Sequence, residues 1–154
     1  MRELIDRVLM KARQMTGAEA GSIFIVRKPG KQGWLVANSL QNDKIKLSKA
    51  DFRIPIVPTS IAGYVASTAE TVLINDLYAI PKDVPCDFDQ SFDLARVYRS
   101  RSMLAFLLTN FQKKIIGVVR LINRRSDKKC TPIAFNDRQA DLILPFNQIV
   151  GCII

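Results

Sequence analysis

The sequence contains no histidine, the side chain that most often serves as a general base in enzymes and as a metal ligand in proteins. A Ser-His-Asp triad, a Cys-His dyad and a histidine-ligated haem are therefore excluded. The sequence also lacks a glycine-rich phosphate-binding loop. From these absences we expect a protein that is not an enzyme.

The chain also has no long apolar run and few cysteines. Its longest apolar runs, residues 103–108 and 115–119, are too short to span a bilayer. Charged side chains occupy three of the first six positions, which is not the pattern of a secretory signal peptide. We therefore expect a cytoplasmic protein that does not contact a membrane. Its three cysteines are expected to be free thiols: Cys86, Cys130 and Cys152.

The composition is that of one globular domain covering residues 1–154. Of these residues, 48% are hydrophobic and 24% are charged, which fits a single core. The net charge is +9, but the basic residues are scattered and form no stripe interleaved with aromatic residues. Nucleic-acid binding is therefore not predicted, and a solvated basic surface or an acidic partner explains the charge instead.

The spacing of apolar residues predicts an α+β fold. A helix is expected at about 2–16, and another at about 137–154 with an interruption or kink near Pro145. Between them, the pattern predicts strands at 22–27, 34–40, 52–56, 71–74, 102–109 and 115–123, short helices after Ser60 and near 92–98, and a basic loop before Phe135. Two hairpins that flank a helical segment favour an antiparallel sheet with helices packed on its faces.

Several segments along nearly the whole chain resemble the GAF domain family. They are LIDRVLMKARQM (4–15), TGAEAGSIFIV (16–26), TSIAGYVASTAETVLIND (59–76), YRSRSMLAFLL (98–108), and IIGVVRLINRR (115–125) followed by Phe135. The resemblance implies a GAF-like, profilin-like fold with a central antiparallel sheet of about six strands. The terminal helices would then lie on one face, and short helices would cover a ligand pocket on the other.

The resemblance also implies a role in signal transduction, as in two-component systems. It predicts a regulatory domain that senses a small molecule, dimerises and controls an attached or partner output domain, such as a kinase, cyclase, phosphodiesterase or transcription regulator. The alternatives are a ligand-free dimerisation module and a GAF-type thiol redox enzyme. The apolar end at 151–154 lies within a predicted helix, so we expect a piece of a longer protein. Because one small sheet cannot bury the apolar faces of 4–15 and 142–154, we predict a homodimer through the terminal helices.

The best candidate for a binding site is the start of the helix after Ser60. The first amides of a helix have no intrahelical partners and carry partial positive charge. Small side chains here would let a ligand approach the backbone, so we predict a small anionic or nucleotide-like ligand of unknown identity. Arg99 or Arg101 would add charge, and Tyr78 would cover the ligand. The predicted set is Ser60, Ile61, Ala62, Gly63, Asn75, Asp76, Tyr78, Arg99 and Arg101.

The signature of the GAF domains that bind cyclic nucleotides is only partly present. Those domains carry an Asn-Lys pair, a Phe and an Asp-Glu pair. Asn123 and Phe135 match, but Arg124 stands where Lys is expected, and Gln139 and Ala140 stand where the acidic pair is expected. Arg124 therefore lacks its expected carboxylate, and a cyclic nucleotide remains an alternative ligand rather than the predicted one.

The loop around Cys86 is acidic and combines a thiol with several carboxylates. A thiolate with carboxylates can bind a divalent metal, which makes Asp83, Cys86, Asp87 and Asp89 candidate ligands, but the loop lacks the glycine of a calcium site. We predict no metal there. Nearby carboxylates would raise the pKa of Cys86, against the chemistry of GAF-related methionine sulfoxide reductases. Bilin attachment is not expected either, because no histidine follows the cysteine.

One arginine stands in an unusual place in the sequence. Arg120 alternates with Ile116, Val118 and Ile122 on an otherwise apolar strand face. A partly buried arginine needs a partner. The sequence alone does not identify that partner.

Overall fold

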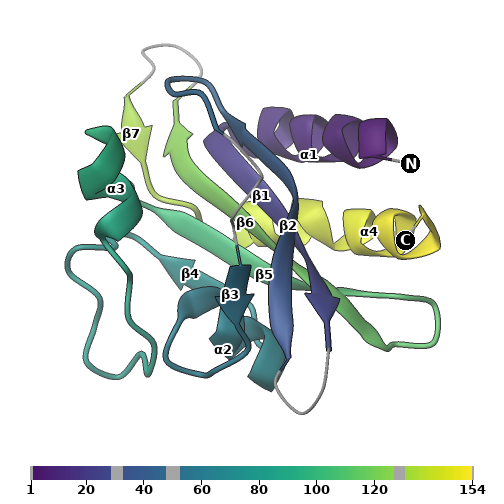
Figure 1. The fold of residues 1–154 in the computed structure, drawn as a ribbon. Helices are drawn as coiled ribbons and strands as arrows, with labels where there is room; N and C mark the ends of the chain where they lie inside the picture. Colours follow the sequence, from purple (N-terminus) through teal and green to yellow (C-terminus); the bar gives the residue numbers. More distant parts are fainter. Residues whose placement is uncertain (1, 29–32, 48–52, 127–130, 154) are drawn as a thin grey trace.

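The computed structural model describes residues 2–28, 33–47, 53–126 and 131–153 (Figure 1). The elements in chain order are α1 (Arg2–Thr16), β1 (Ala18–Arg27), β2 (Trp34–Asn42), β3 (Arg53–Pro55), α2 (Ile61–Thr68), β4 (Val72–Ile74), α3 (Ser91–Arg96), β5 (Met103–Thr109), β6 (Ile115–Arg125), β7 (Pro132–Ile133) and α4 (Asp137–Ile153). None of these helices is both long and apolar enough to cross a membrane.

The strands form one antiparallel sheet in the order β3-β2-β1-β6-β5-β4, and the short β7 pairs with β6 outside this path. Every strand pair is antiparallel. Figure 1 shows α1 and α4 together on one face of the curled sheet, and α2 and α3 away from them. The predicted α+β, GAF-like fold with a six-stranded path is confirmed.

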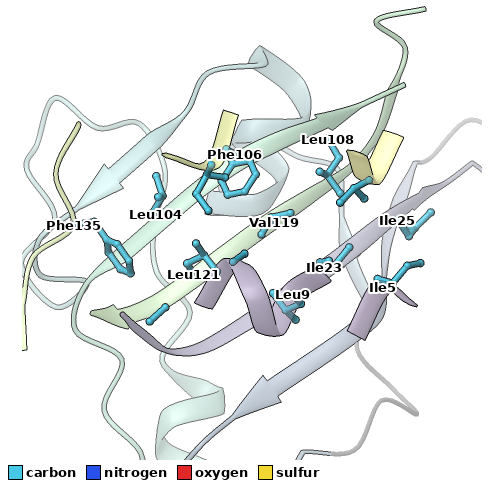
Figure 2. Packing of buried hydrophobic residues seen from close by; sticks show 14 residues of the cluster. Ile5, Leu9, Ile23, Ile25, Leu104, Phe106, Leu108, Val119, Leu121 and Phe135 are labelled. Carbon is cyan, nitrogen blue, oxygen red and sulfur yellow. The ribbon is translucent and has the colours of Figure 1, made fainter. Parts of the chain in front are cut away.

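The sheet separates two apolar layers because its side chains alternate between the faces. On β6, Val119 and Leu121 pack toward the terminal helices, whereas Val118 packs toward α2. Figure 2 shows the first layer, with Leu9 of α1 facing the sheet. The labelled residues of this layer are Ile5, Leu9, Ile23, Ile25, Leu104, Phe106, Leu108, Val119, Leu121 and Phe135. The second layer packs α2 onto the opposite face.

Some element boundaries differ from those predicted. β1 begins at Ala18 rather than at residue 22, because its first residues are already buried between β2 and β6. β7 replaces part of the predicted basic loop; a two-residue strand has no apolar alternation to reveal it. Of the two alternatives predicted near Pro145, the interruption is wrong, since α4 continues through this residue, and the kink stays a prediction.

Candidate ligand pocket

A pocket of about 680 Å³ lies on the sheet face that carries α2. Its floor comes from β1, β2 and β6, and its walls come from β3, the start of α2, residues 87–89 and α3. This volume falls within the range of small-molecule binding sites. The pocket is therefore the candidate functional site.

The floor of the pocket carries Arg120, which lies on the central strand β6. Its Nε donates a hydrogen bond to Ser22 Oγ at 3.2 Å, and its guanidinium lies 4.6 Å from the centre of the Phe24 ring. Within the described part of the chain, no carboxylate forms an ion pair with Arg120. Burial lowers the pKa of Arg120 to about 10, so the guanidinium still carries its charge at neutral pH.

The walls combine apolar side chains with charges. The apolar members include Leu40, Ile54, Phe88, Phe92, Met103 and Ile122. Two more arginines line the pocket and stack on aromatic rings: Arg53 lies 5.9 Å from the ring centre of Trp34, and Arg96 lies 4.4 Å from that of Phe92. Among the lining residues that the structure describes, Asp87 and Asp89 are the acidic ones. The pocket thus offers an apolar interior with a small excess of positive charge.

The predicted helix start contributes one wall of this pocket. Ser60, Ile61 and Ala62 line it, but Gly63 does not. The Gly63 amide donates to Ser60 Oγ at 3.1 Å, so it is already satisfied by the helix N-cap. A Cβ at Gly63 would lie 2.1 Å from the Val57 carbonyl oxygen, so this glycine permits close packing. The helix start therefore has fewer available amides than predicted.

The remaining predicted residues gather elsewhere. The Tyr78 hydroxyl donates to Asp93 Oδ2 at 2.7 Å, and the Arg99 guanidinium lies 3.9 Å from the centre of the Tyr78 ring. Asp93 is buried and also accepts hydrogen bonds from Ser100. Asp76 Oδ1 accepts from the Tyr78 amide. The described lining of the pocket does not include the other predicted residues, which are Asn75, Asp76, Tyr78, Arg99 and Arg101.

A buried polar network supports the pocket wall at Tyr98. The Tyr98 hydroxyl donates to Glu19, and the Asn123 amide donates to Glu19 and to the Arg99 carbonyl. Burial alone would raise the pKa of Glu19, but these hydrogen bonds from Tyr98 and Asn123 and the charge of Lys44 together lower it. Burial, followed by the bond to Glu19, raises the pKa of Tyr98. Tyr98 therefore stays a neutral donor at physiological pH.

The positions of the partial cyclic-nucleotide signature have structural partners. Asn123 Oδ1 accepts from the Arg101 amide at 2.6 Å. Arg124 Nη1 donates to the Ala134 carbonyl at 2.9 Å, so a carbonyl takes the place of the expected carboxylate. The buried Gln139 accepts from the Asn136 amide at 2.8 Å and so supports the start of α4.

Within the described residues, the structure brings together no group of three His, Cys, Asp or Glu side chains, in the acidic loop or elsewhere. Cys86 is buried in the core beneath α2, while Asp83, Asp87 and Asp89 are exposed. The pKa of Cys86 is raised, first by burial and only then by Asp87. The predicted direction of this shift is confirmed, but burial rather than the carboxylates is its main cause.

The sequence prediction omitted Arg120, Arg53 and Tyr98 from the binding site, although all three line the pocket. One signal for Arg120 was present, because it alternates with apolar residues on a central strand. No comparable signal marked Tyr98, whose place depends on contacts with Glu19 and Asn123 that are distant in sequence.

Comparison with known proteins agrees with this architecture. The family profile of the GAF domain matches residues 1–146. The cGMP-specific 3',5'-cyclic phosphodiesterase of Drosophila virilis is 27% identical over 128 residues, which make up 79% of this chain and 14% of that protein. The phosphodiesterase of the same name from Drosophila melanogaster is 29% identical over 128 residues, which make up 79% of this chain and 11% of that protein. The chain thus spans only a small part of these relatives.

Solved structures share the fold at low sequence identity. A methyl-accepting chemotaxis protein is 18% identical and superimposes with a TM-score of 0.72. The alignment covers 98% of this chain and 86% of that chain. The free methionine-R-sulfoxide reductase of Neisseria meningitidis is 19% identical and superimposes with a TM-score of 0.69. The alignment covers 97% of this chain and 75% of that chain. With the profile match over residues 1–146, these findings show that the chain belongs to the GAF domain family.

Proposed function

We propose that this GAF domain is a cytoplasmic regulatory domain that senses a small molecule, forms a dimer and controls an output domain in signal transduction. The pocket of about 680 Å³ carries this proposal, because it combines apolar walls with a small number of polar groups. The matched phosphodiesterases, of which this chain spans a small part, support a setting beside an output domain.

We propose no catalytic turnover for this domain. Cys86 is buried and its pKa is raised, so little of its thiol is present as the nucleophilic thiolate at neutral pH. The other described cysteine, Cys152, is exposed near the end of α4. Cys130 lies outside the described residues. No cysteine is among the described lining residues of the pocket, and a fold shared with a methionine sulfoxide reductase does not by itself imply its activity.

The pocket proposal is tested with the variant Ala95→Trp. Ala95 lies on α3, is exposed and lines the pocket, so an indole ring can enter the pocket without disturbing the core. The test first screens nucleotides, cyclic dinucleotides and organic acids by thermal shift and native mass spectrometry. We expect Ala95→Trp to weaken binding of a stabilising compound about 10- to 100-fold, measured by calorimetric titration.

The matched control is Leu94→Trp on the same helix. Leu94 is 74% exposed and does not line the described pocket, so this variant should bind as the wild type does. Equal affinity of Ala95→Trp and the wild type would place the ligand outside the pocket. If no compound stabilises the wild type or is retained by it, a ligand-free dimerisation module becomes the better interpretation.

The dimer is proposed because α1 and α4 expose apolar side chains although they pack against each other. Met10 is 49% exposed and Leu144 is 64% exposed. The exposed apolar residues of the two helices are Leu4, Met10, Met15, Leu142, Leu144 and Ile149. Exposed apolar residues on two neighbouring helices can be covered by a second copy across a two-fold axis.

We expect the wild type to be a dimer at high micromolar concentration and the double variant Met10→Glu, Leu144→Glu to be a monomer. Each substitution places a charge within the apolar interface, where it would lack a partner. Size-exclusion chromatography with light scattering measures the mass. The control Leu94→Glu changes a 74% exposed residue of α3, which lies away from α1 and α4 in Figure 1, and should remain dimeric. A monomeric wild type would rule out the proposed assembly.

A further inference from the structure

We propose that the ligand of the pocket is a small organic anion with an apolar body, and that Arg120 binds its oxyanion on the floor of the sheet. This inference rests on the proposed function and names the chemical class that the pocket takes. It assigns the leading role to a strand residue rather than to the start of α2.

The hydrogen bonds of Arg120 leave one side of its guanidinium available. Nε is directed to Ser22 Oγ, whereas the two terminal nitrogens have no hydrogen-bond partner among the described residues. Those nitrogens are not sealed in the core either, since Arg120 lines the pocket and neither atom is among the buried atoms that lack a partner. Two parallel N–H donors on a guanidinium match the two oxygens of a carboxylate or phosphate.

Within the described residues, no carboxylate serves as a counter-ion for this arginine. Asp87 and Asp89 also line the pocket, but neither forms an ion pair with Arg120 in the described part of the chain. Asp89 instead accepts a hydrogen bond from the Ser91 amide at 2.9 Å. Arg53 and Arg96 add positive charge to the same pocket. Among the described lining residues, three arginines stand against two aspartates, and this excess of positive charge favours the entry of an anion.

The remaining surface of the pocket defines the body of the ligand. Leu40, Ile54, Met103 and Ile122 present apolar surface beside Arg120. An inorganic ion is far smaller than about 680 Å³ and would leave this surface in contact with water. The fitting chemistry is therefore an aromatic or branched organic acid, or a phosphate ester of an apolar or heterocyclic group.

The unliganded protein retains a charge that is costly to keep. Burial lowers the pKa of Arg120, which means that the surroundings disfavour the charged guanidinium when no anion is present. Arg120→Met removes the charge but keeps an apolar stem over Phe24. This variant should therefore have opposite effects on stability and on binding, which a purely structural residue would not show.

The experiment compares thermal shifts and calorimetric affinities for defined probes. Benzoate and indole-3-acetate represent carboxylates, phenyl phosphate and cGMP represent phosphate esters, and benzamide is the neutral counterpart of benzoate. We expect at least one anionic probe to stabilise the wild type and benzamide to have no effect. Arg120→Met should weaken the binding of that probe about 10- to 100-fold while melting at a higher temperature than the wild type without ligand. Stabilisation by a carboxylate or by a phosphate ester identifies the source of the oxyanion.

Two control variants separate charge at the site from overall charge. Arg120→Lys keeps a positive charge on the floor and should recover part of the affinity, whereas Arg7→Gln removes an exposed charge on α1 and should bind normally. Unchanged binding by Arg120→Met, stabilisation by benzamide equal to that by benzoate, or no stabilisation by any anionic probe would each overturn this inference. If one of these outcomes is found but Ala95→Trp blocks the binding of a neutral ligand, the proposed function stands and only the inference about Arg120 fails. If Ala95→Trp blocks no ligand, both fail.

Discussion

Replacing Gly117 by valine is expected to leave most of the protein unfolded under conditions in which the wild type is folded. Gly117 lies on β6, between β1 and β5, and a Cβ at this position would lie 2.1 Å from the Phe24 carbonyl oxygen. That atom belongs to the backbone of β1, which pairs with β2 and β6, so moving it would disrupt hydrogen bonds of the sheet. We expect a loss of about 4 kcal/mol or more, which approaches the total stability of a typical domain.

Circular dichroism during thermal and urea unfolding measures this effect. Gly33→Ala is the matched glycine control, because a Cβ there would meet only the end of the Ile56 side chain, at 2.9 Å. A flexible side chain can move by a few tenths of an ångström, so the control should unfold close to the wild type. A Gly117→Val protein with a wild-type urea midpoint would show that β1 and β6 separate easily at this position.

The second large effect is expected for Asn123→Ala. The Asn123 side chain donates to Tyr98 Oη at 3.0 Å and to the Arg99 carbonyl at 2.9 Å, and it accepts from the Arg101 amide at 2.6 Å. Its φ of 59° lies in the left-handed region, which asparagine tolerates better than alanine. Removal of these buried bonds together with the added backbone strain should cost about 3 kcal/mol, measured from urea unfolding curves. Asn75→Ala, at an exposed site outside the network, is the control and should change stability little.

Asn123→Ala should also change the response to acid. The pKa of Glu19 is lowered in the folded protein, so its contribution to stability is present above the ordinary value of 4.5 and is lost as pH falls through the lowered folded pKa. The variant lacks one of the hydrogen bonds that lower this pKa. Its folded pKa should therefore lie closer to the ordinary value, so the variant should lose less stability on acidification and the loss should level off at a higher pH. Parallel pH profiles for the variant and the wild type would contradict this role of the network.

Much of the fold could be predicted because local patterns and tertiary structure agree. The apolar periodicity of the first helix and the two long hairpins matches the observed α1, β1–β2 and β5–β6. The early start of β1 was missed because Ala18, Glu19 and Ala20 have weak strand preference. Their burial depends on partners far away in the sequence, such as Tyr98 and Asn123 for Glu19.

The site was only partly predictable for a related reason. The helix start at Ser60–Ala62 could be placed because its N-cap is local in sequence. The position of Tyr78 could not be predicted, because its hydroxyl donates a hydrogen bond to the buried Asp93, which lies fifteen residues further along the chain. For Arg120, the alternation on β6 indicated that it lies on the same face of the strand as Val118 and Ile122. The shape and the charge of the opposite wall come from α3 and from residues 87–89, whose arrangement has no local signal.

The position of Arg120 on β6 restricts how occupancy of the pocket can be communicated to the rest of the molecule. Its sequence neighbours Val119 and Leu121 point to the other face, into the layer beneath α1 and α4. From Arg120 itself, the direct route by which a ligand at the guanidinium can act on the terminal helices is a displacement of the β6 backbone. The signal would then be a small shift or twist of β6, carried by the same residues that hold β1 and β5 in register.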